Sequence, residues 1–398
     1  MIQQALILCG GLGTRLGELT ATTPKPLLNV GGRPFLDVLL HELGRHGIRD
    51  VVLLAAFESQ QIRDYAATTV VARKFGMTVS VSVEPDQAGT AGAIYHTRDR
   101  LADQFLLLNG DSWFNFNLLS LPDLGNFDVM MTVRELEDAS RSGVVELSDN
   151  RVTSFRERPT QPGPGLVNAG VYALTRQVVD EFPETGSLER DVLPRLVSEN
   201  RVGGVIRQGY FIDIGVPESY ERAQTEIPTQ LNRPAVFFDR DGVLNYDHGY
   251  VGTVDQFQWM PGAQEVIRRF NEAGWLVFVV TNQAGVARGY YSEEDVVRLH
   301  SWMNQQLAGS AAHIDDFRYC PFHEDAAHVL YRRSSSWRKP NPGMIQDLAE
   351  RWSVDQDRSI MIGDKTLDLE AALAAGLPGF LYAGDDLNKY IDALQVLP

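Results

Sequence analysis

Short apolar runs alternate with longer amphipathic stretches along this chain, and this alternation restricts the possible folds more than any other feature. The runs in the first half are ALILCG near the N-terminus, VVLLAAF from Val51, TVSVSVE from Thr78 and FLLLNGD from Phe105. The pattern restarts after Leu231 with AVFFDRDG, WLVFVVTNQAG from Trp275, IMIGD from Ile360 and GFLYAGDD from Gly379. Because this alternation is typical of βαβ units, we expect two α/β domains, each around a mostly parallel sheet.

A polar segment with two prolines, EIPTQLNRP from Glu226 to Pro234, separates the two halves. It has neither helical nor strand periodicity, which is typical of a linker. The chain of 398 residues is also long enough for two domains, each with its own core. We therefore expect a first domain at 1–228, a linker at 229–234 and a second domain at 235–398, with the boundary near Asn232.

The net charge and the cysteine content limit which partners the protein is expected to bind and in which cellular compartment it is expected to act. The formal net charge of −16 disfavours binding to nucleic acid or to an anionic membrane, because both need a basic surface. Cys9 and Cys320 are the only cysteines, which favours a reducing compartment over a disulfide framework. The chain has no signal-peptide pattern and no apolar run as long as a membrane span. We expect a cytoplasmic protein that acts on small molecules; a homo-oligomer stays open.

A glycine-rich loop, LCGGLGTRLGELTATTPKP, follows the first expected strand. Its glycines let backbone N–H groups turn toward polyphosphate oxygens, and its two cations add positive charge. These residues are Gly10, Gly11, Gly13, Arg15 and Lys25. The loop is neither a Walker A motif nor the dinucleotide fingerprint. It predicts a site for a nucleoside triphosphate, and an ordinary turn between strand and helix is the alternative.

A second motif, FFDRDGVLN, places Asp239 and Asp241 at the end of an expected strand. Because alternate residues of a strand project from the same side, the two can act as nucleophile and acid/base in phosphoester hydrolysis. Alone, the D-x-D-G pattern also fits a calcium loop or a turn. Thr281 in VVTNQAG, Lys339 in RKPNPG and Asp364 in IGDKTLD complete a four-part set that favours a phosphatase.

The N-terminal half resembles the sugar-1-phosphate nucleotidylyltransferases. The likeness continues through blocks in family order: EPDQAGTAGA, LLNGDSWF, FRERP, VNAGVYAL, SLERDVLPRL and YFIDIGVPESY. It implies a Rossmann-like nucleotidyltransferase fold and attack of a sugar 1-phosphate on the α-phosphorus of a nucleoside triphosphate, with release of pyrophosphate. Positioning two anions and neutralising the developing charge would be the main work of such a site.

The resemblance also implies a role for individual residues. Arg15 would bind the β- and γ-phosphates, and Lys25 would contact the α-phosphate and the sugar phosphate. Asp111 and Asp213 would hold Mg²⁺, which prefers oxygen ligands. A helix cap is the alternative for Asp111. Asp213 lies between two isoleucines, where an unpaired carboxylate would be costly to bury, and this favours a ligand role.

Further positions are implied for the nucleotide and the sugar. Sugar hydroxyls would meet Glu157, Asn168 and Gly170, and Arg158 stands where the family often has lysine. The nucleotide would contact Leu8, Gly10, Gly11, Gly13, Thr14, Gln87, Gly89, Thr90 and Gly110.

The C-terminal motifs resemble the haloacid dehalogenase superfamily. Within it, DRDGVLN, TNQAGVARG and RKPNPGM are most similar to heptose bisphosphate and histidinol phosphate phosphatases. The resemblance implies a Rossmannoid fold, and the short distance between the first two motifs implies that it has no cap domain.

Residue roles follow from this second resemblance too. Asp239 would be the nucleophile, Asp241 the general acid and then base, and Thr281 and Lys339 would bind phosphoryl oxygens. Mg²⁺ would be held by Asp239, Asp364 and Asp241, the last through its carbonyl group. Asp368 would lie outside the metal's own ligands, and Asn282 and Arg338 would contact the substrate.

The phosphatases of this group usually carry a structural zinc loop, in which a C-x-H element precedes a C-x-C. Here Cys320 and His323 occur as CPFH and His328 follows, but SSSW occupies the place of the C-x-C. With one cysteine the usual tetrahedral set is incomplete. We expect a loop without metal, and a makeshift site of these three residues is the alternative.

Together the halves resemble fused enzymes that prepare activated D-glycero-D-manno-heptose for surface glycans such as lipopolysaccharide or S-layer glycan. The C-terminal domain would hydrolyse the 7-phosphate of heptose 1,7-bisphosphate through a phosphoaspartate. The N-terminal domain would then transfer a nucleotidyl group, GMP from GTP by the resemblance, to heptose 1-phosphate. Because the product of the phosphatase would be the substrate of the transferase, the fusion of the two domains has a chemical logic.

Several alternatives stay open. ATP or another nucleotide could replace GTP, and the anomer is not fixed. A mannose-1-phosphate or other hexose-1-phosphate transferase joined to a broad sugar phosphate or histidinol phosphate phosphatase would carry the same motifs. An N-terminal module that only senses a ligand is an alternative of another class, which the intact Arg15, Lys25, Asp111 and Asp213 disfavour.

Overall fold

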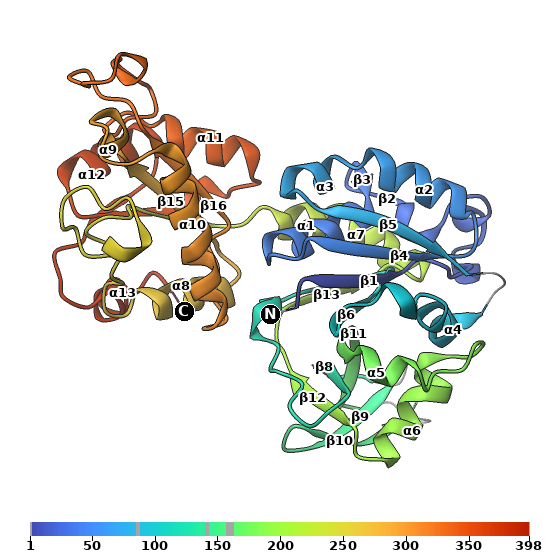
Figure 1. Cartoon of the computed structure of the whole chain (residues 1–398). Helices are drawn as coiled ribbons and strands as arrows, with labels where there is room; N and C mark the ends of the chain where they lie inside the picture. Colours follow the sequence, from blue (N-terminus) through green and yellow to red (C-terminus); the bar gives the residue numbers. More distant parts are fainter. Residues whose placement is uncertain (1, 85–87, 140–142, 157–162, 398) are drawn as a thin grey trace. The chain divides into compact units, whose positions relative to one another are not determined.

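The computed structural model describes residues 2–84, 88–139, 143–156 and 163–397. It divides the chain into two compact units, Met1–Pro228 and Thr229–Pro398, which are described separately (Figure 1). Three predicted positions, Gln87, Glu157 and Arg158, lie outside the described residues.

Unit 1 is built on a nine-stranded sheet in the order β5-β4-β1-β6-β11-β8-β12-β10-β9. The first four of these strands are parallel, whereas β11 is antiparallel to both of its main neighbours. The sheet is therefore mixed, with a parallel half that carries the glycine-rich loop. Its strands are β1 Gln4–Leu8, β4 Asp50–Ala55, β5 Thr78–Val83, β6 Gln104–Asn109, β8 Val129–Leu136, β9 Val144–Ser148, β10 Arg151–Arg156, β11 Gly165–Thr175 and β12 Val202–Ile206.

Two short ribbons complete the strands of unit 1. β2 (Asn29–Val30) pairs with β3 (Arg33–Pro34), and β7 (Ser112–Asn115) pairs antiparallel with β13 (Tyr210–Asp213). The second ribbon matters for the site, because its register places Asp213 opposite Ser112, next to Asp111.

Helices cover both faces of the parallel strands of unit 1, with α1 to α3 on one side and α4 on the other in Figure 1. The core on the α4 side joins alternate residues of β1 and β6, such as Leu6, Phe105 and Leu107, to Ile94 of α4. This agrees with a parallel strand that is apolar on both faces. The helices are α1 Phe35–Arg45, α2 Ser59–Thr68, α3 Val70–Phe75, α4 Gly89–Tyr95, α5 Arg176–Val179, α6 Leu193–Ser198 and α7 Pro217–Leu231.

Helix α7 continues further along the chain than the sequence indicated. It ends at Leu231, three residues into the segment expected as a linker, and Pro228 lies inside it. Ala223, Ile227 and Leu231 are all buried and lie four residues apart, so they form one apolar face of a helix. This periodicity was missed because the polar residues and prolines between them dominate the segment.

Unit 2 contains a five-stranded, all-parallel sheet in the order β16-β15-β14-β17-β18. Val236 and Phe238 of β14 share one core with Phe270 of α8 and Met303 of α10. On the alternate positions, Phe237 contacts Phe278 of β15 at a ring distance of 5.2 Å. Both faces of the sheet are thus apolar and covered, as expected for parallel strands.

The elements of unit 2 are short and regular. The strands are β14 Ala235–Phe238, β15 Leu276–Asn282, β16 Asp316–Cys320, β17 Ile360–Gly363 and β18 Gly379–Leu381. The helices are α8 Ala263–Glu272, α9 Ala284–Ala287, α10 Glu293–Ala308, α11 Gly343–Arg351, α12 Thr366–Ala374 and α13 Leu387–Leu394.

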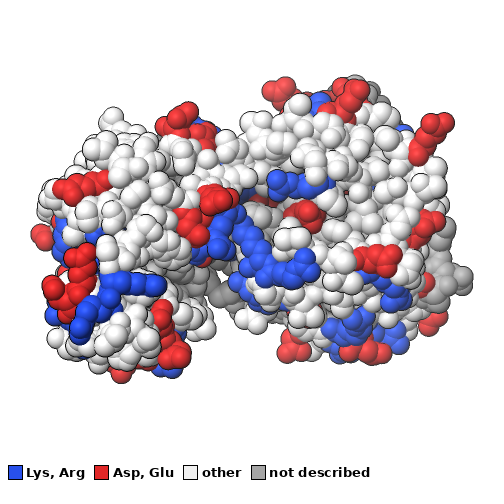
Figure 2. Space-filling model, turned by 90° about the horizontal axis from the view of Figure 1, so that it is seen from above, with Lys and Arg blue, Asp and Glu red and all other residues white. Residues whose placement is uncertain are grey.

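Charged side chains of both signs lie on the face of the molecule that Figure 2 draws. On the face drawn in Figure 2, acidic and basic side chains intermix and large areas are uncharged. Among the described residues, no helix combines the length and the apolar character that crossing a bilayer requires.

Candidate active sites in the two units

The predicted nucleotide loop of unit 1 lies at the carboxyl ends of two adjacent parallel strands. β1 ends at Leu8 and β6 at Asn109, and these two residues are paired in the sheet. A Cβ added to Gly110 would overlap the backbone oxygen of Leu8, so only glycine allows this approach. Carboxyl ends of parallel strands are the usual position of ligand sites in α/β sheets.

Two cations and two carboxylates meet at this edge. The Lys25 ammonium lies 2.7 Å from Asp111 Oδ2, and the amide of Ile214 donates to the Asp111 carbonyl at 2.9 Å. The latter bond brings the neighbouring Asp213 close to Asp111. The Arg15 guanidinium comes to the same place, since a Cβ built on Gly215 would lie 3.4 Å from Arg15 Nη2 and 3.5 Å from Lys25 Nζ.

Asp213 is not buried, although both of its neighbours are. Ile212 and Ile214 face the interior, and strand alternation turns Asp213 toward solvent, so the argument from burial cost was wrong for this residue. The surrounding protein and the Asp111 carboxylate raise the pKa of Asp213, while the Gly215 amide donates to its Oδ1 at 2.6 Å. Two carboxylates that repel each other beside an open space form a site that a cation would stabilise.

A pocket of about 220 Å³ opens beside these charges. Six predicted residues line it: Leu8, Gly11, Lys25, Thr90, Gly110 and Asp111. Sequence reasoning did not single out its other lining residues, Cys9, Pro26, Asn109, Tyr172, Ser187, Leu188 and Glu189. Three of these come from the SLERDVLPRL block, which was recognised only as a family block and received no role.

The loops around the pocket fix the remaining nucleotide residues. Gly89 has a φ of 75°, and a Cβ there would lie 2.5 Å from the Gly186 oxygen. Thr90 Oγ1 accepts the Leu188 amide at 2.7 Å, which joins the start of α4 to the SLERDVLPRL block. The other described positions, Gly10, Gly13 and Thr14, belong to the glycine-rich loop but do not line the pocket. Gly13 has a left-handed backbone conformation, with a φ of 64°.

The predicted sugar residues lie beyond the nucleotide loop. The Asn168 amide donates to the Tyr172 hydroxyl and, at 3.1 Å, to Glu189 Oε1. Its Oδ1 accepts the Gly170 amide at 3.0 Å. Because Tyr172 and Glu189 line the pocket, Asn168 and Gly170 lie directly behind one of its walls.

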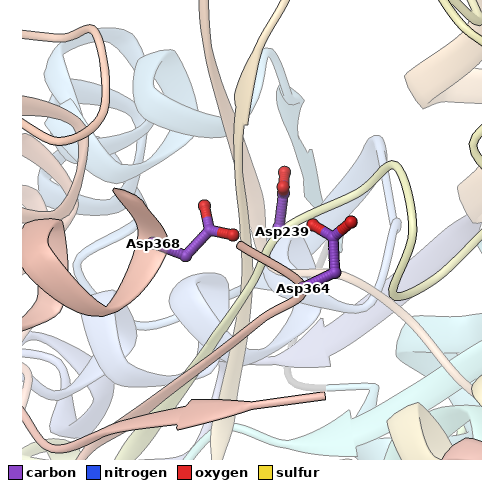
Figure 3. Close-up of side chains that lie close together, drawn as sticks. All are labelled: Asp239, Asp364 and Asp368. Carbon is purple, nitrogen blue, oxygen red and sulfur yellow. The ribbon is translucent and has the colours of Figure 1, made fainter. Parts of the chain in front are cut away.

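In unit 2, three carboxylates converge at the carboxyl end of the sheet (Figure 3). Asp239 follows β14, Asp364 follows β17 and Asp368 lies in α12, and one oxygen of each falls within 4.8 Å of the others. Among the described residues this is the only group of acidic, histidine or cysteine side chains with the spacing of metal ligands. Three carboxylates with this spacing can hold a divalent cation.

Lys339 balances part of this negative charge. Its ammonium lies 2.8 Å from Asp239 Oδ1 and 2.7 Å from Asp368 Oδ1, and it donates to the Val280 carbonyl. Burial raises the pKa of Asp239 to about 7, against the pull of Lys339. Asp364 Oδ1 is buried with no hydrogen-bond partner in the described part of the chain, which is costly unless a cation or ligand binds there.

Asp241 is held by three neighbours that the motif search did not identify as functional. Arg240 donates to both of its carboxylate oxygens at 3.1 Å, and Asn245 Nδ2 donates to Oδ1 at 3.0 Å. Gln283 Nε2 donates to Asp241 Oδ2 at 2.9 Å and to Thr281 Oγ1 at 2.8 Å. The two predicted catalytic side chains are thus joined through one amide. Asp241 lies outside the group of three carboxylates.

The two predicted substrate contacts of unit 2 have different surroundings. Both amide atoms of Asn282 bond to the backbone of Lys339, at 3.1 and 3.0 Å, so this side chain positions Lys339. Arg338 donates to the Phe322 carbonyl at 3.2 Å. Burial lowers the pKa of Arg338, and nearby Arg288 lowers it further. In the described residues neither arginine forms an ion pair with a carboxylate, so both remain available to an anion.

The three residues of the zinc alternative do not form a metal site in the described residues. Cys320 is buried, its thiol points to the Phe322 carbonyl at 3.9 Å, and burial raises its pKa. His323 Nδ1 accepts the Asp325 amide, and the His328 ring packs against Tyr331 at 5.5 Å. A structural zinc site requires four ligands, with thiolate for each cysteine, and this donor set does not fit one.

Fold and charge arrangement together define an α/β enzyme that handles phosphate groups in each of two units. A family profile described as nucleotidyl transferase matches residues 4–230, and one described as HAD-hydrolase-like matches residues 336–389. The chain belongs to the nucleotidyl transferase family, with a haloacid dehalogenase-like phosphatase as its second unit.

Curated relatives match each unit separately. D-glycero-beta-D-manno-heptose-1,7-bisphosphate 7-phosphatase of Rhodopseudomonas palustris is 52% identical over 164 residues, which cover 41% of this chain and 91% of the relative. D-glycero-alpha-D-manno-heptose 1-phosphate guanylyltransferase of Campylobacter jejuni is 33% identical over 220 residues, or 54% of this chain and 96% of the relative.

A solved structure matches unit 1. The crystal structure of HddC from Yersinia pseudotuberculosis aligns with a TM-score of 0.51 and 29% identity, covering 57% of this chain and all of that one. The same protein complexed with GMP-PN aligns with a TM-score of 0.50.

Proposed function

We propose that the chain carries out two consecutive steps in the synthesis of a nucleotide-activated heptose. Unit 2 hydrolyses the 7-phosphate of D-glycero-D-manno-heptose 1,7-bisphosphate, and unit 1 transfers GMP from GTP to the resulting heptose 1-phosphate. The observation that supports the proposal is that each unit brings together its own set of charged groups. These sets lie in units similar to two enzymes that act on the same sugar.

In unit 2, Asp239 would attack phosphorus and break the bond to the C7 oxygen, and Asp241 would give that oxygen a proton. Asp241 would then take a proton from the water that hydrolyses the phosphoaspartate. Lys339 and Thr281 would bind the phosphoryl oxygens. Mg²⁺, when bound, would neutralise charge at Asp239 and Asp364. Arg288 and Arg338, which have no carboxylate partners among the described residues, would meet the phosphate that is not cleaved.

In unit 1, Lys25 and Arg15 would neutralise the triphosphate while the sugar phosphate oxygen attacks its α-phosphorus. Asp111 and Asp213 would hold Mg²⁺. The short Lys25–Asp111 contact supports this arrangement, because a cation shared between a carboxylate and phosphate oxygens can move toward the charge that develops.

We propose the α-anomer for both steps. Hydrolysis at C7 leaves the anomeric carbon unchanged, so the transferase decides which anomer the pair must handle, and its relative is named for the α-anomer. The phosphatase relative is named for the β-anomer, which makes this choice testable.

The test supplies each anomer of heptose 1,7-bisphosphate with Mg²⁺ and, separately, GTP, ATP, CTP or UTP. Phosphate, pyrophosphate and sugar nucleotide are followed by mass. We expect GDP-heptose from the α-anomer. Phosphate release without any sugar nucleotide would contradict the transferase assignment. If a hexose bisphosphate gave as much sugar nucleotide as heptose bisphosphate does, heptose as the sugar would be contradicted.

A further inference from the structure

The segment that follows β16 in unit 2 forms several hydrogen bonds within itself and to neighbouring elements, although it has no suitable set of metal ligands. It runs from Cys320 to Arg338 and contains a short helical turn at Val329–Tyr331. The Arg332 side chain donates to the Ala326 carbonyl at 2.7 Å, and the His323 amide donates to the Tyr331 carbonyl at 3.1 Å. These bonds close the segment on itself.

One carboxylate joins this segment to the rest of unit 2. Glu293 accepts the Tyr319 hydroxyl at Oε2, 2.8 Å away, and the Tyr331 hydroxyl at Oε1, 3.0 Å away. Tyr319 belongs to β16, Tyr331 to the loop, and Glu293 to the first turn of α10. Both oxygens of one side chain thus cross-link three elements. We call Glu293, Tyr319 and Tyr331 the tyrosine clamp.

The first turn of α10 fixes the orientation of the clamp. Ser292 caps α10 and exchanges hydrogen bonds with Asp295, which fixes the first helical turn. A carboxylate at a helix N-terminus is stabilised by the backbone dipoles. Burial and the bond to Glu293 raise the pKa of both tyrosines, so each hydroxyl remains a donor.

The loop also contacts a residue next to the predicted catalytic residues at the carboxyl end of the sheet. The Phe322 carbonyl accepts Arg338 Nη1, and the Arg333 guanidinium lies 3.8 Å from the centre of the Phe322 ring. Arg338 directly precedes Lys339, which contacts Asp239. The position of the loop therefore determines where Arg338 points.

We propose that the tyrosine clamp does the work of a structural metal: Glu293 anchors a metal-free loop through two tyrosine hydroxyls, and the loop positions Arg338 for the substrate. Glu293, Tyr319 and Tyr331 are positioning residues, since none reaches the three carboxylates. The part of the inference that concerns substrate rests on the proposed phosphatase function, whereas the part that concerns the loop does not.

The test uses the full chain with Glu293→Gln and Tyr331→Phe. The second variant removes one hydroxyl and keeps the ring that packs on His328 and Phe322. Glu294→Gln is the matched control, because it removes the same charge one residue further on from a carboxylate that receives neither hydroxyl. Limited trypsin cleavage after Arg332 and Arg333, both exposed, reports loop order without any substrate.

We expect cleavage in the loop to be about tenfold faster in both variants, as for loss of a hydrogen bond to a charged group. KM for heptose bisphosphate should rise by about the same factor, and kcat should change far less. Glu294→Gln should behave as the wild type, and elemental analysis should find no zinc bound in stoichiometric amount.

Two results would overturn the proposal: one zinc per chain whose chelation speeds cleavage, or cleavage in both clamp variants at the wild-type rate. An unchanged KM with faster cleavage would also reject the link to Arg338. If the protein hydrolyses no heptose bisphosphate, the proposed function fails, and the cleavage rates still decide whether the clamp holds the loop.

Discussion

Lys25 is the residue whose removal should separate the two activities most sharply. Its ammonium contacts Asp111 and lies at the edge of the unit 1 pocket. Lys25→Ala should lower nucleotidyl transfer by about 10²- to 10³-fold, the usual effect of removing one group that stabilises developing charge. Phosphate release by unit 2 should be unchanged. Pyrophosphate and phosphate assays on one preparation measure both, with the exposed Lys389→Ala as control; equal loss of both activities would contradict the assignment.

His300 should make the stability of unit 2 depend on pH. It accepts a hydrogen bond from the buried Arg240 and stacks on Phe317, and burial with the nearby guanidinium holds its pKa well below the usual value. The folded state therefore keeps His300 neutral while the unfolded state binds a proton. Stability is complete above the unfolded pKa of about 6.5 and falls as the pH drops from there toward the folded pKa.

The measurement compares His300→Gln with the wild type. Free energies of unfolding of the wild type should include a component that falls by up to about 1.4 kcal/mol per pH unit below about pH 6.5. The variant should lack this component, so the difference between the two proteins should shrink as the medium becomes more acidic. A constant difference across that range would show that His300 is not the group that titrates.

Motif residues could be predicted from the sequence because their signal is local. Asp239 and Asp364 lie at the expected edge, where Lys339 contacts Asp239, and Asp368, which was expected outside the metal's own ligands, belongs to the same group of carboxylates. The residues that were missed act through distant partners: Gln283 reaches Asp241 across 42 positions, and Glu293 reaches Tyr331 across 38. A glutamine in a loop or a glutamate at the start of a helix gives no sign of such a contact until the chain is folded.

Among the structural elements, the strand ends in unit 1 depend on one close approach. A side chain at Gly110 would meet the Leu8 carbonyl at the end of β1, and a backbone group cannot move aside as a flexible side chain can. Gly110→Ala should therefore destabilise unit 1 by about 1–3 kcal/mol and lower transfer. Gly11→Ala is the control for stability, because a Cβ there meets nothing within 4 Å. The melting temperatures of both variants are compared with that of the wild type. An unchanged melting temperature for the Gly110→Ala variant would contradict the prediction.

Element type was easier to predict than element pairing. The apolar runs became β1, β4, β5 and β6 as expected, but nothing in their periodicity indicated that β11 pairs antiparallel with β6 and β8. Strand direction depends on connections made between residues far apart in the chain. The same holds for α7, whose buried spacing of four residues was hidden by intervening polar residues.

For the whole molecule, the two charge sets predict two chemically independent steps. When heptose bisphosphate is the only sugar supplied, the Asp239→Asn variant should release no phosphate. The Lys25→Ala variant should release phosphate, and heptose 1-phosphate should accumulate. A mixture of the two variants should restore the sugar nucleotide, because the intermediate can diffuse from one protein to the other. No product from the mixture would indicate that the intermediate is passed only within one chain.

The negative net charge of the protein also has a kinetic consequence. Every expected substrate is a polyanion, yet the protein carries a net charge of −16. Long-range forces should therefore slow the encounter, and attraction should begin only near the arginines and lysines of each pocket. Salt shortens the reach of the repulsion to about 10 Å at 0.1 M. Moderate ionic strength should thus raise kcat/KM of both reactions, the opposite of what electrostatically steered enzymes do.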